Sequence, residues 1–111
     1  MGQRLPEPSV ESIELTAVLS ALADPNRRAL MGELYRSGEP RDCGALDRCV
    51  VTGLSAPTLS HHWKVLRESG LTRTVAEGRS RIISVRREDM EARFPGLLGA
   101  VLGAPVDNSA G

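Results

Sequence analysis

The clearest hydrophobic pattern in the chain lies between residues 55 and 71. Four residues recur there at three- and four-residue spacing and predict the inward face of one helix: Leu59, His62, Trp63 and Leu66. Ser55 can cap this helix, because its hydroxyl can accept a hydrogen bond from an unpaired amide of the first turn. Pro57 lies in that turn, where a missing amide hydrogen costs nothing. Gly70 can take the left-handed conformation that ends a helix.

Three helical patterns come before this one. They run from about Ser9 to Leu22, from Asp24-Pro25 to about Ser37, and from Arg41 to Cys49. Asp24 and Pro25 read as an N-cap followed by a first-turn proline, and Gly38 ends the second helix. The third pattern is joined to the capped helix by a short turn that contains Gly53. Two short helices joined in this way predict a helix-turn-helix.

After Gly70 the pattern changes from helical to alternating. Residues 71–76 and 80–85 predict two strands, and Glu77-Gly78 supply the turn of a hairpin. A hairpin that directly follows a helix-turn-helix is typical of a wing. The pattern is helical again from Arg86 and is interrupted near Pro95.

These elements predict an α+β fold that is mostly α. It is a winged helix-turn-helix with about five helices and a two-stranded β-hairpin wing. We expect a flexible N-terminal lead-in at residues 1–8, one winged-helix domain at residues 9–103, and a disordered tail at residues 104–111.

Composition adds weaker limits. The 111 residues fit one domain. No apolar run approaches the length of a membrane-spanning helix, so no membrane partner is expected. Met1–Ser9 does not resemble a signal peptide, and two cysteines without such a signal favour free thiols in a reducing compartment. We therefore expect a cytoplasmic protein.

Charge changes the picture more than composition does. The formal net charge is zero, yet residues 55–87 carry seven basic and two acidic side chains. A basic third in a neutral chain predicts a polarised surface that attracts polyanions. The outward positions of the capped helix can all donate hydrogen bonds without carrying negative charge: Thr58, Ser60, His61, Lys64 and Arg67.

We therefore predict binding to double-stranded DNA. The second helix of a helix-turn-helix enters the major groove, where the bases present distinct donors and acceptors. Lys64 can reach a guanine edge or a phosphate, whereas Ser55, Thr58 and Ser60 suit positioning contacts. Arg79 and Arg81 on the wing can reach phosphates or the adjacent minor groove. The predicted DNA-binding residues are Ser55, Thr58, Ser60, His61, Lys64, Arg67, Arg79 and Arg81.

Three stretches of the chain resemble the ArsR/SmtB family of bacterial winged-helix regulators. They are Leu22-Ala-Asp-Pro-Asn-Arg-Arg-Ala-Leu, the segment from Leu54 to Leu71, and the Gly78-Arg hairpin. The resemblance covers about residues 13–103. It implies a homodimer on an inverted-repeat operator, with the first and last helices forming the interface. That would give a role to apolar residues that one small domain can hardly bury: Val18, Leu19, Leu22, Leu97, Leu98, Val101 and Leu102.

Many relatives in that family leave DNA when a metal binds, but the family's usual ligands are not found here. Cys43 and Cys49 do not form the family's Cys-x-Cys pair, and on one helix their thiols would point about 120° apart. The last helix has no histidine. His62 suits a packed core position, and His61 suits a DNA-facing donor. We expect no metal site and no cofactor, although a metal- or thiol-responsive repressor with a non-standard site remains an alternative.

Two other classes of function were considered. An enzyme is not expected, because no nucleophile-base pair, glycine-rich phosphate loop or paired carboxylates stand out. A winged helix that binds another protein is a second alternative, since fold does not determine function, and a protein co-regulator remains possible. The basic helix and wing favour DNA.

Overall fold

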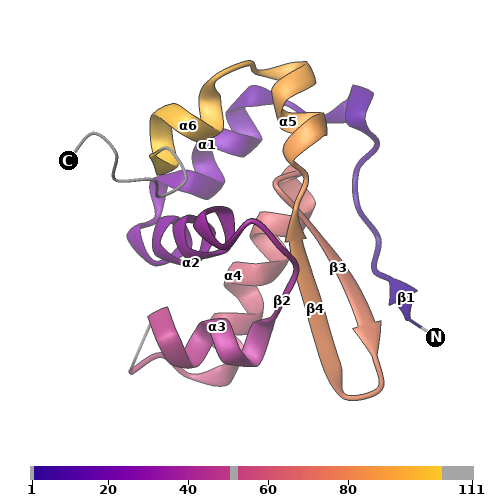
Figure 1. Cartoon of the computed structure of the whole chain (residues 1–111), viewed down its shortest axis with the longest axis vertical. Helices are drawn as coiled ribbons and strands as arrows, with labels where there is room; N and C mark the ends of the chain where they lie inside the picture. The colour runs from indigo at the N-terminus through magenta and orange to yellow at the C-terminus, as the bar shows by residue number, and fades with distance from the viewer. Residues whose placement is uncertain (1, 51–52, 104–111) are drawn as a thin grey trace.

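The computed structural model describes residues 2–50 and 53–103, except for the side chain of Cys49. It contains a helical part and a small sheet that carries a long hairpin (Figure 1). The helices are α1 (Leu15–Ala23), α2 (Pro25–Ser37), α3 (Cys43–Val50), α4 (Ala56–Ser69), α5 (Arg87–Arg93) and α6 (Leu97–Leu102), with a 3-10 turn η1 (Val10–Ser12) before them. The strands are β1 (Gln3–Arg4), β2 (Arg41–Asp42), β3 (Thr72–Glu77) and β4 (Ser80–Val85).

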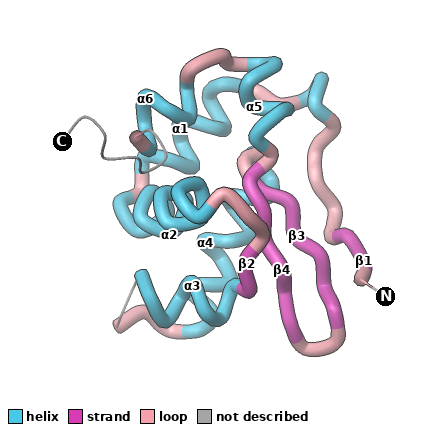
Figure 2. The backbone as a smooth tube through the Cα atoms, in the orientation of Figure 1, coloured by secondary structure: helices cyan, strands magenta, loops and turns pink. Residues whose placement is uncertain are grey.

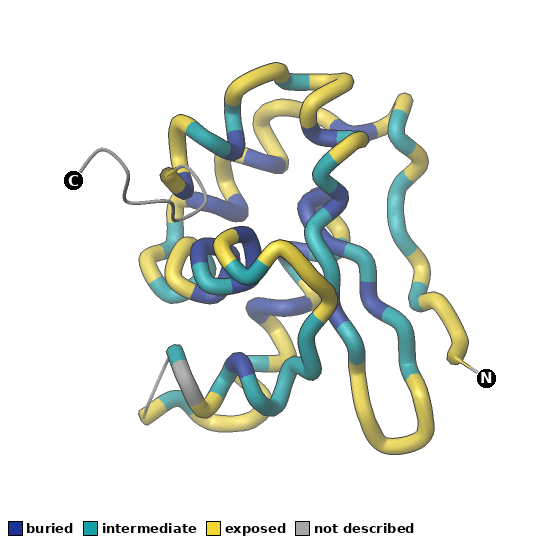
Figure 3. The backbone as a smooth tube through the Cα atoms, viewed as in Figure 1, coloured by how far each residue is buried: buried dark blue, intermediate teal, exposed yellow. Residues whose placement is uncertain are grey.

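The predicted winged helix-turn-helix is confirmed. Helices α3 and α4 form the helix-turn-helix, and β3 and β4 form the wing directly after α4. The hairpin pairs in register from Thr72 opposite Val85 to Glu77 opposite Ser80, so Gly78 and Arg79 form its tip. The tip extends away from the helices and is exposed (Figures 2 and 3).

The sheet is larger than the two strands that the sequence predicted. Four strands lie in the order β1-β3-β4-β2, and each neighbouring pair is antiparallel. Gln3 pairs with Ala76 on one edge, and Arg41 pairs with Ile83 on the other. An isolated two-stranded hairpin is marginally stable, and these short flanking strands satisfy backbone groups on both of its edges.

The predicted helix ends are confirmed. Asp24 Oδ1 accepts hydrogen bonds from the backbone amides of Asn26 at 2.8 Å and Arg27 at 3.1 Å. Ser55 Oγ accepts one from the Thr58 amide at 3.3 Å. Gly38 and Gly70 end α2 and α4 with φ values of 74° and 97°, in the left-handed region. These caps fix where α2 and α4 start and stop.

Gly70 has a second role, because the chain before α1 packs on it. A Cβ atom at Gly70 would lie 2.6 Å from Cγ1 of Ile13, which is itself fully buried. Ile13 is in extended conformation, with φ −69° and ψ 129°. The single helix predicted from Ser9 to Leu22 is therefore wrong. It is split into η1 and α1, because the chain straightens at Ile13 to place this side chain in the core.

The N-terminal segment also differs from the prediction. Residues 3–13, hereafter the N-terminal strap, run along the sheet from β1 to the start of α1 instead of forming a lead-in outside the domain (Figure 1). Leu5 continues the pairing of β1, because its amide donates to the Thr74 carbonyl at 2.9 Å. The strap therefore packs as part of the folded domain. The predicted tail at residues 104–111 lies outside the described residues.

The core lies where α1, α2, α4 and α6 meet the inner face of the sheet. Its fully buried members include Val18, Leu30, Met31, Leu34, Leu46, Leu66, Leu71, Ile83, Met90 and Leu98. The inward face predicted for α4 is confirmed at its C-terminal half, where His62, Trp63 and Leu66 are buried. Leu59, nearer the N-terminus, is only half-buried.

Four of the seven residues predicted to form a dimer interface are part of this core instead. Val18, Leu22, Leu98 and Leu102 are buried within one chain, because α1, α2 and α6 pack against one another. The prediction that a single domain cannot bury them is wrong. Exposed large apolar side chains remain on the outer face of the same helices: Leu15 at 44%, Leu19 at 46% and Val101 at 37%. Leu97 is half-buried.

The last helical region breaks near Pro95, as predicted, which gives α5 and α6 and a total of six α-helices among the described residues instead of about five. Within residues 2–50 and 53–103, no helix combines the length and apolar character needed to cross a membrane.

Candidate nucleic-acid interface

A tryptophan links the two helices of the helix-turn-helix. The indole Nε1 of Trp63 on α4 donates a hydrogen bond to Oδ1 of Asp47 on α3 at 2.9 Å. Burial raises the pKa of Asp47, and the Trp63 hydrogen bond acts in the opposite direction. The spacing of apolar residues predicted Trp63 to be in the core. It did not identify Asp47, since nothing in the spacing shows that the two side chains meet.

The other side of α4 is anchored by His62. Its Nδ1 lies 3.1 Å from Nη1 of Arg27 on α2. A guanidinium can only donate, so His62 Nδ1 is the acceptor and its ring proton is on Nε2. Arg27 Nε in turn donates to the Ala21 carbonyl at 2.7 Å. The predicted role of His62 as a packed, hydrogen-bonded core histidine is confirmed.

With one face anchored, α4 presents the other to solvent. Thr58, Ser60, His61 and Lys64 are all exposed. Ser55 and Thr58 are also partners of each other, with 2.9 Å between their hydroxyl oxygens at the start of the helix. The structure thus brings four of the predicted contact residues onto one exposed face, and Ser55 serves chiefly to cap it.

The wing adds two arginines beside this face. Arg79 lies in the turn between β3 and β4, and Arg81 lies on β4 opposite Ala76. Both are exposed, and neither forms an ion pair or a side-chain hydrogen bond with another described residue. Arg81 and Ser60 line the same cavity, so β4 approaches α4 at this point. Two unpaired cations therefore flank the exposed face of α4.

Arg67 lies differently from the other predicted contact residues. Its Nε donates to the carbonyl of Pro6 at 3.2 Å, and the residue is half-buried. This contact ties the C-terminal half of α4 to the N-terminal strap. Arg67 consequently belongs to the side of α4 away from Thr58 and His61.

Not all of the seven basic side chains between residues 55 and 87 are free at the surface, contrary to the sequence-based prediction. Arg73 binds Glu7 with both nitrogens, through Nε at 3.0 Å and Nη2 at 2.8 Å. Arg86, only 3% exposed in its side chain, lies 3.7 Å from Glu7 and donates from Nε to Asp89 at 3.0 Å. Two of the seven cations are therefore neutralised by carboxylates within the chain. The sequence analysis missed this cluster, since Glu7 is 66 residues away from Arg73.

Glu7 shows how closely these groups interact. Burial by itself would raise its pKa, but the hydrogen bond and charge of Arg73, with the charges of Arg86 and Arg4, outweigh that effect. The pKa of Glu7 therefore lies below its ordinary value, and the group stays ionised. Its carboxylate holds the N-terminal strap to β3 and to the start of α5.

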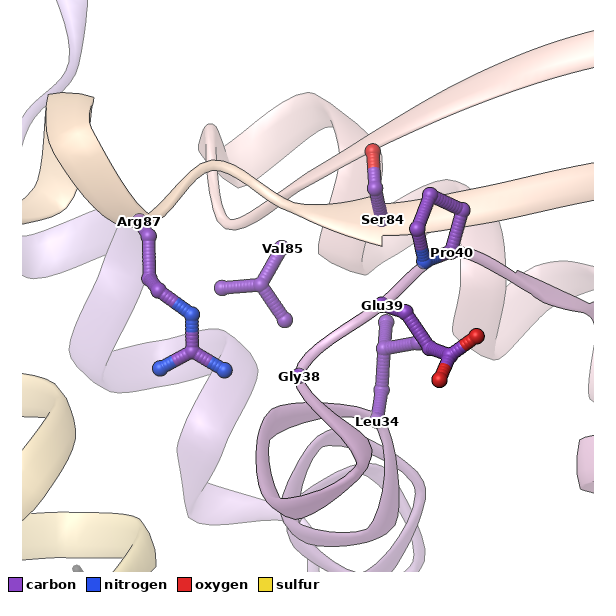
Figure 4. A pocket seen from close by; sticks show the side chains of 7 residues that line it. All are labelled: Leu34, Gly38, Glu39, Pro40, Ser84, Val85 and Arg87. Atoms are coloured by element: carbon purple, nitrogen blue, oxygen red, sulfur yellow. The ribbon is translucent and has the colours of Figure 1, made fainter. Parts of the chain in front are cut away.

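Arg87 is also used inside the molecule. Its guanidinium lies 4.1 Å from the centre of the Tyr35 ring and donates to the Tyr35 carbonyl. It borders a hollow between the end of α2 and β4, together with Leu34 and Val85 (Figure 4). Of the seven basic residues, only Lys64, Arg79 and Arg81 have no such partner among the residues that the structure describes.

The described residues do not bring potential metal ligands together. Among the residues described, no group of three or more histidine, cysteine and carboxylate side chains is placed to hold a metal ion. Cys43 is half-buried at the start of α3, where burial, followed by the charges of Asp47 and Asp42, raises its pKa. A raised pKa keeps this thiol protonated and unreactive near neutral pH. The side chain of Cys49 lies outside the description.

Comparisons with known proteins identify the family of this chain. Residues 22–75, which contain α2 to most of β3, match a family model described as a helix-turn-helix domain. The chain is 35% identical over 82 residues to an uncharacterised HTH-type transcriptional regulator of Bacillus subtilis, YceK, covering 73% of this chain and 79% of that protein. It is 32% identical over 78 residues to an arsenical resistance operon repressor of Staphylococcus xylosus, covering 70% and 71%.

Solved structures give the same answer. One is described as an ArsR family transcriptional regulator; it is 31% identical, with a TM-score of 0.63 over 78% of this chain and 90% of that one. Another is the transcriptional repressor BigR of Xylella fastidiosa, 25% identical, with a TM-score of 0.57 over 81% and 87%. This chain belongs to the ArsR family of helix-turn-helix, DNA-binding transcriptional regulators.

Proposed function

We propose that this regulator binds an inverted-repeat operator as a homodimer, with α4 in the major groove and the wing beside it. The observation that carries the proposal is the pairing of two features. Hydrogen-bond donors line the exposed face of α4. Arg79 and Arg81, the two arginines between residues 55 and 87 that have no partner among the described residues, stand next to that face. A helix N-terminus with polar side chains suits base edges, and unpaired arginines suit phosphates.

Each contact residue receives a role from its surroundings. Thr58, Ser60 and His61 would position the helix or reach base edges, and Lys64 would bind a guanine edge or a phosphate. Arg79 and Arg81 would bind backbone phosphates or enter the minor groove, where the negative potential favours arginine. Ser55 would act indirectly by capping α4. Arg67, held by Pro6, is the weakest candidate of the original set.

The proposed dimer interface is narrower than the sequence indicated. It consists of the apolar side chains that one chain leaves exposed on α1 and α6, namely Leu15, Leu19 and Val101, with Leu97 at its edge. These side chains belong to the two helices that the family resemblance assigns to the interface. A two-fold pairing would cover this surface and place two copies of α4 on successive turns of DNA.

We propose further that this protein acts without the metal sites usual in its family. The absence of a Cys-x-Cys pair and of any histidine in α5 and α6 supports this.

Operator selection from random duplex fragments tests DNA binding, followed by anisotropy titration of the selected fragment at several salt concentrations. We expect the logarithm of the affinity to fall linearly with the logarithm of salt concentration, since phosphate contacts release counterions. A failure to retain any duplex at low ionic strength would contradict the proposal. Salt-independent capture of a protein partner instead would favour the interaction-module alternative.

Two matched substitutions test the interface. Leu19→Glu should convert the dimer to a folded monomer, measured by light scattering and circular dichroism, because Leu19 is exposed in the single chain. Ala29→Glu, at an exposed position on α2, is the control for an added charge and should remain dimeric. A Leu19→Glu protein that is still dimeric would exclude this surface as the interface.

A further inference from the structure

A cavity of about 280 Å³ lies between α4 and the wing, and the proposed function uses only Ser60 and Arg81 at its edge. It is lined by Cys43 at the start of α3, by Ser60, Trp63 and Arg67 on α4, by Thr74 on β3, and by Arg81 and Ile83 on β4. Its size is at the lower end of the range for small-molecule sites. It lies between α4 and the wing, the two parts of the molecule that carry the proposed DNA contacts.

Three polar side chains of this cavity, Thr74, Ser60 and Arg81, lack a partner within the described chain. Thr74 is 2% exposed, and its hydroxyl makes no hydrogen bond within the described chain. Arg81 and Ser60 likewise bond to no described side chain or backbone group, and Arg67 uses only its Nε. Thr72 is also unpaired, but it is fully enclosed and does not line the cavity. A buried hydroxyl without a partner is costly, so a polar occupant would relieve that cost.

The remaining walls are apolar. Trp63 and Ile83 are buried core residues, and Cys43 contributes a thiol rather than a thiolate. Two guanidinium groups, two hydroxyls and an apolar wall together match a ligand with an anionic head and an apolar body. A backbone phosphate of DNA would use the arginines alone and would not need the apolar wall or the buried Thr74.

We propose that this cavity is a binding site for a small organic anion, a carboxylate or phosphate attached to an apolar group. The inference rests on the proposed function in one respect: the occupant would engage Arg81 and Ser60, which are also proposed to contact DNA. Ligand binding would therefore compete with operator binding and would provide an inducer site without metal.

The single tryptophan of the chain reports on the cavity directly, because Trp63 forms part of its wall. We would titrate the DNA-free protein with benzoate and, separately, with inorganic phosphate at constant ionic strength, and follow Trp63 fluorescence. Benzoate should give a saturable change, and phosphate should bind at least tenfold more weakly. The absence of a saturable response to either probe would overturn the proposal, and tighter binding of phosphate would overturn the requirement for an apolar body.

Substitutions test whether the change in Trp63 fluorescence comes from benzoate bound in this cavity. Thr74→Val keeps the side-chain shape and removes the unpaired hydroxyl, and Arg81→Gln removes one cation; each should weaken benzoate binding at least tenfold. Arg79→Gln is the matched control, because Arg79 is an exposed wing arginine that does not line the cavity. Thermal melts would establish that all three variants are folded. An equal loss in Arg79→Gln, or none in Thr74→Val, would place the binding elsewhere.

A final arm separates this site from the DNA contact itself. Thr74→Val should leave operator affinity unchanged and should abolish the weakening of operator binding by benzoate. If Thr74→Val instead weakened operator binding as much as Arg81→Gln did, the cavity would be a phosphate contact of the DNA complex, and the proposal would be wrong. Benzoate binding in a protein that binds no DNA would leave the site standing and would overturn the proposed function alone.

Discussion

The arginines next to the N-terminal strap and the wing arginines next to α4 have opposite surroundings. On the strap side, Arg73 and Arg86 are bound to Glu7, and Arg93 donates to the carbonyls of Glu11 at 2.8 Å and Ile13 at 2.6 Å. On the side of the recognition helix, Arg79 and Arg81 have no partner in the described chain. The same side chain therefore serves as an internal brace in one region and as a free cation in the other.

The difference is explained by the groups that surround each guanidinium. Along the strap, a carboxylate and several backbone carbonyls are within reach, and the low exposure of Arg86 strengthens these contacts. Arg79 at the wing tip and Arg81 beside it make no ion pair or side-chain hydrogen bond within the described chain, so their charges are available to an external anion. Counting basic residues in a sequence segment overestimates a DNA-binding surface when some of those residues are neutralised internally.

The largest expected effect comes from breaking the strap. Glu7→Gln should lower the free energy of unfolding by about 3 kcal/mol, because it leaves the buried Arg86 and the partly buried Arg73 without one carboxylate. Urea denaturation followed by circular dichroism measures this. At temperatures where the variant remains folded, operator affinity should be unchanged.

Loss of operator affinity in folded Glu7→Gln would show that the contacts of the N-terminal strap also affect DNA binding by the exposed face of α4. That result would break the comparison drawn above, since the braced arginines would then matter for binding as well as for stability.

The next effect tests the free cations. Lys64→Ala combined with Arg81→Ala should weaken operator binding about 30-fold, or about 2 kcal/mol, without a change in the melting temperature. If both residues contact phosphates, the salt dependence should also become shallower by about two units of slope. Arg36→Ala is the control, an exposed arginine on α2 that lies 3.8 Å from Glu33. Equal weakening by Arg36→Ala would point to net charge rather than to this face.

A smaller effect separates capping from recognition at Ser55. Ser55→Ala should lower the free energy of unfolding by about 1 kcal/mol, because the Thr58 amide loses its acceptor. Ser55→Asn should restore the stability, since asparagine is as good a cap. Measured by urea denaturation beside an anisotropy titration, operator affinity should be the same in both folded variants. Poor binding by the stable Ser55→Asn protein would make the hydroxyl itself a DNA contact.

A final prediction concerns the dependence of stability on pH. Because the folded-state pKa of Glu7 is lowered, its contribution is complete above its ordinary value of 4.5 and is lost as the pH falls through the lower folded value. The pKa of Asp24 is also lowered, chiefly by the hydrogen bond from the Arg27 amide. The contribution of Asp24 to stability is therefore lost in the same acidic range. The free energies of unfolding of the natural chain and of Glu7→Gln, each measured by urea denaturation and plotted against pH, should therefore converge in acid. A constant difference between the two down to pH 2 would show that Glu7 has an ordinary pKa.

The hydrophobic pattern predicted the elements of the recognition face well. The boundaries of α4, its cap at Ser55, its stop at Gly70 and the following hairpin depend on residues within a few positions of one another. Such local preferences are visible in a sequence. The Trp63–Asp47 hydrogen bond was not foreseen, because it joins two helices across 16 positions.

The apolar residues of α1 and α6 show the limit of the same reasoning. Val18 and Leu19 were both predicted to lie at a dimer interface, yet Val18 is fully buried and Leu19 is nearly half exposed. Neighbours in sequence on a helix differ by about 100°, and only the position of α2 and α6 determines which of them is covered.

The sequence alone determined the helix-turn-helix, the wing and the identity of the donors on α4, since each arises from short-range backbone and capping preferences. Tertiary structure decided which arginines are free, which leucines are exposed, and that residues 3–13 brace the sheet. Those outcomes depend on contacts such as Glu7 with Arg73, between positions far apart in the chain, and a pairing of that kind forms only when the whole core brings its partners together.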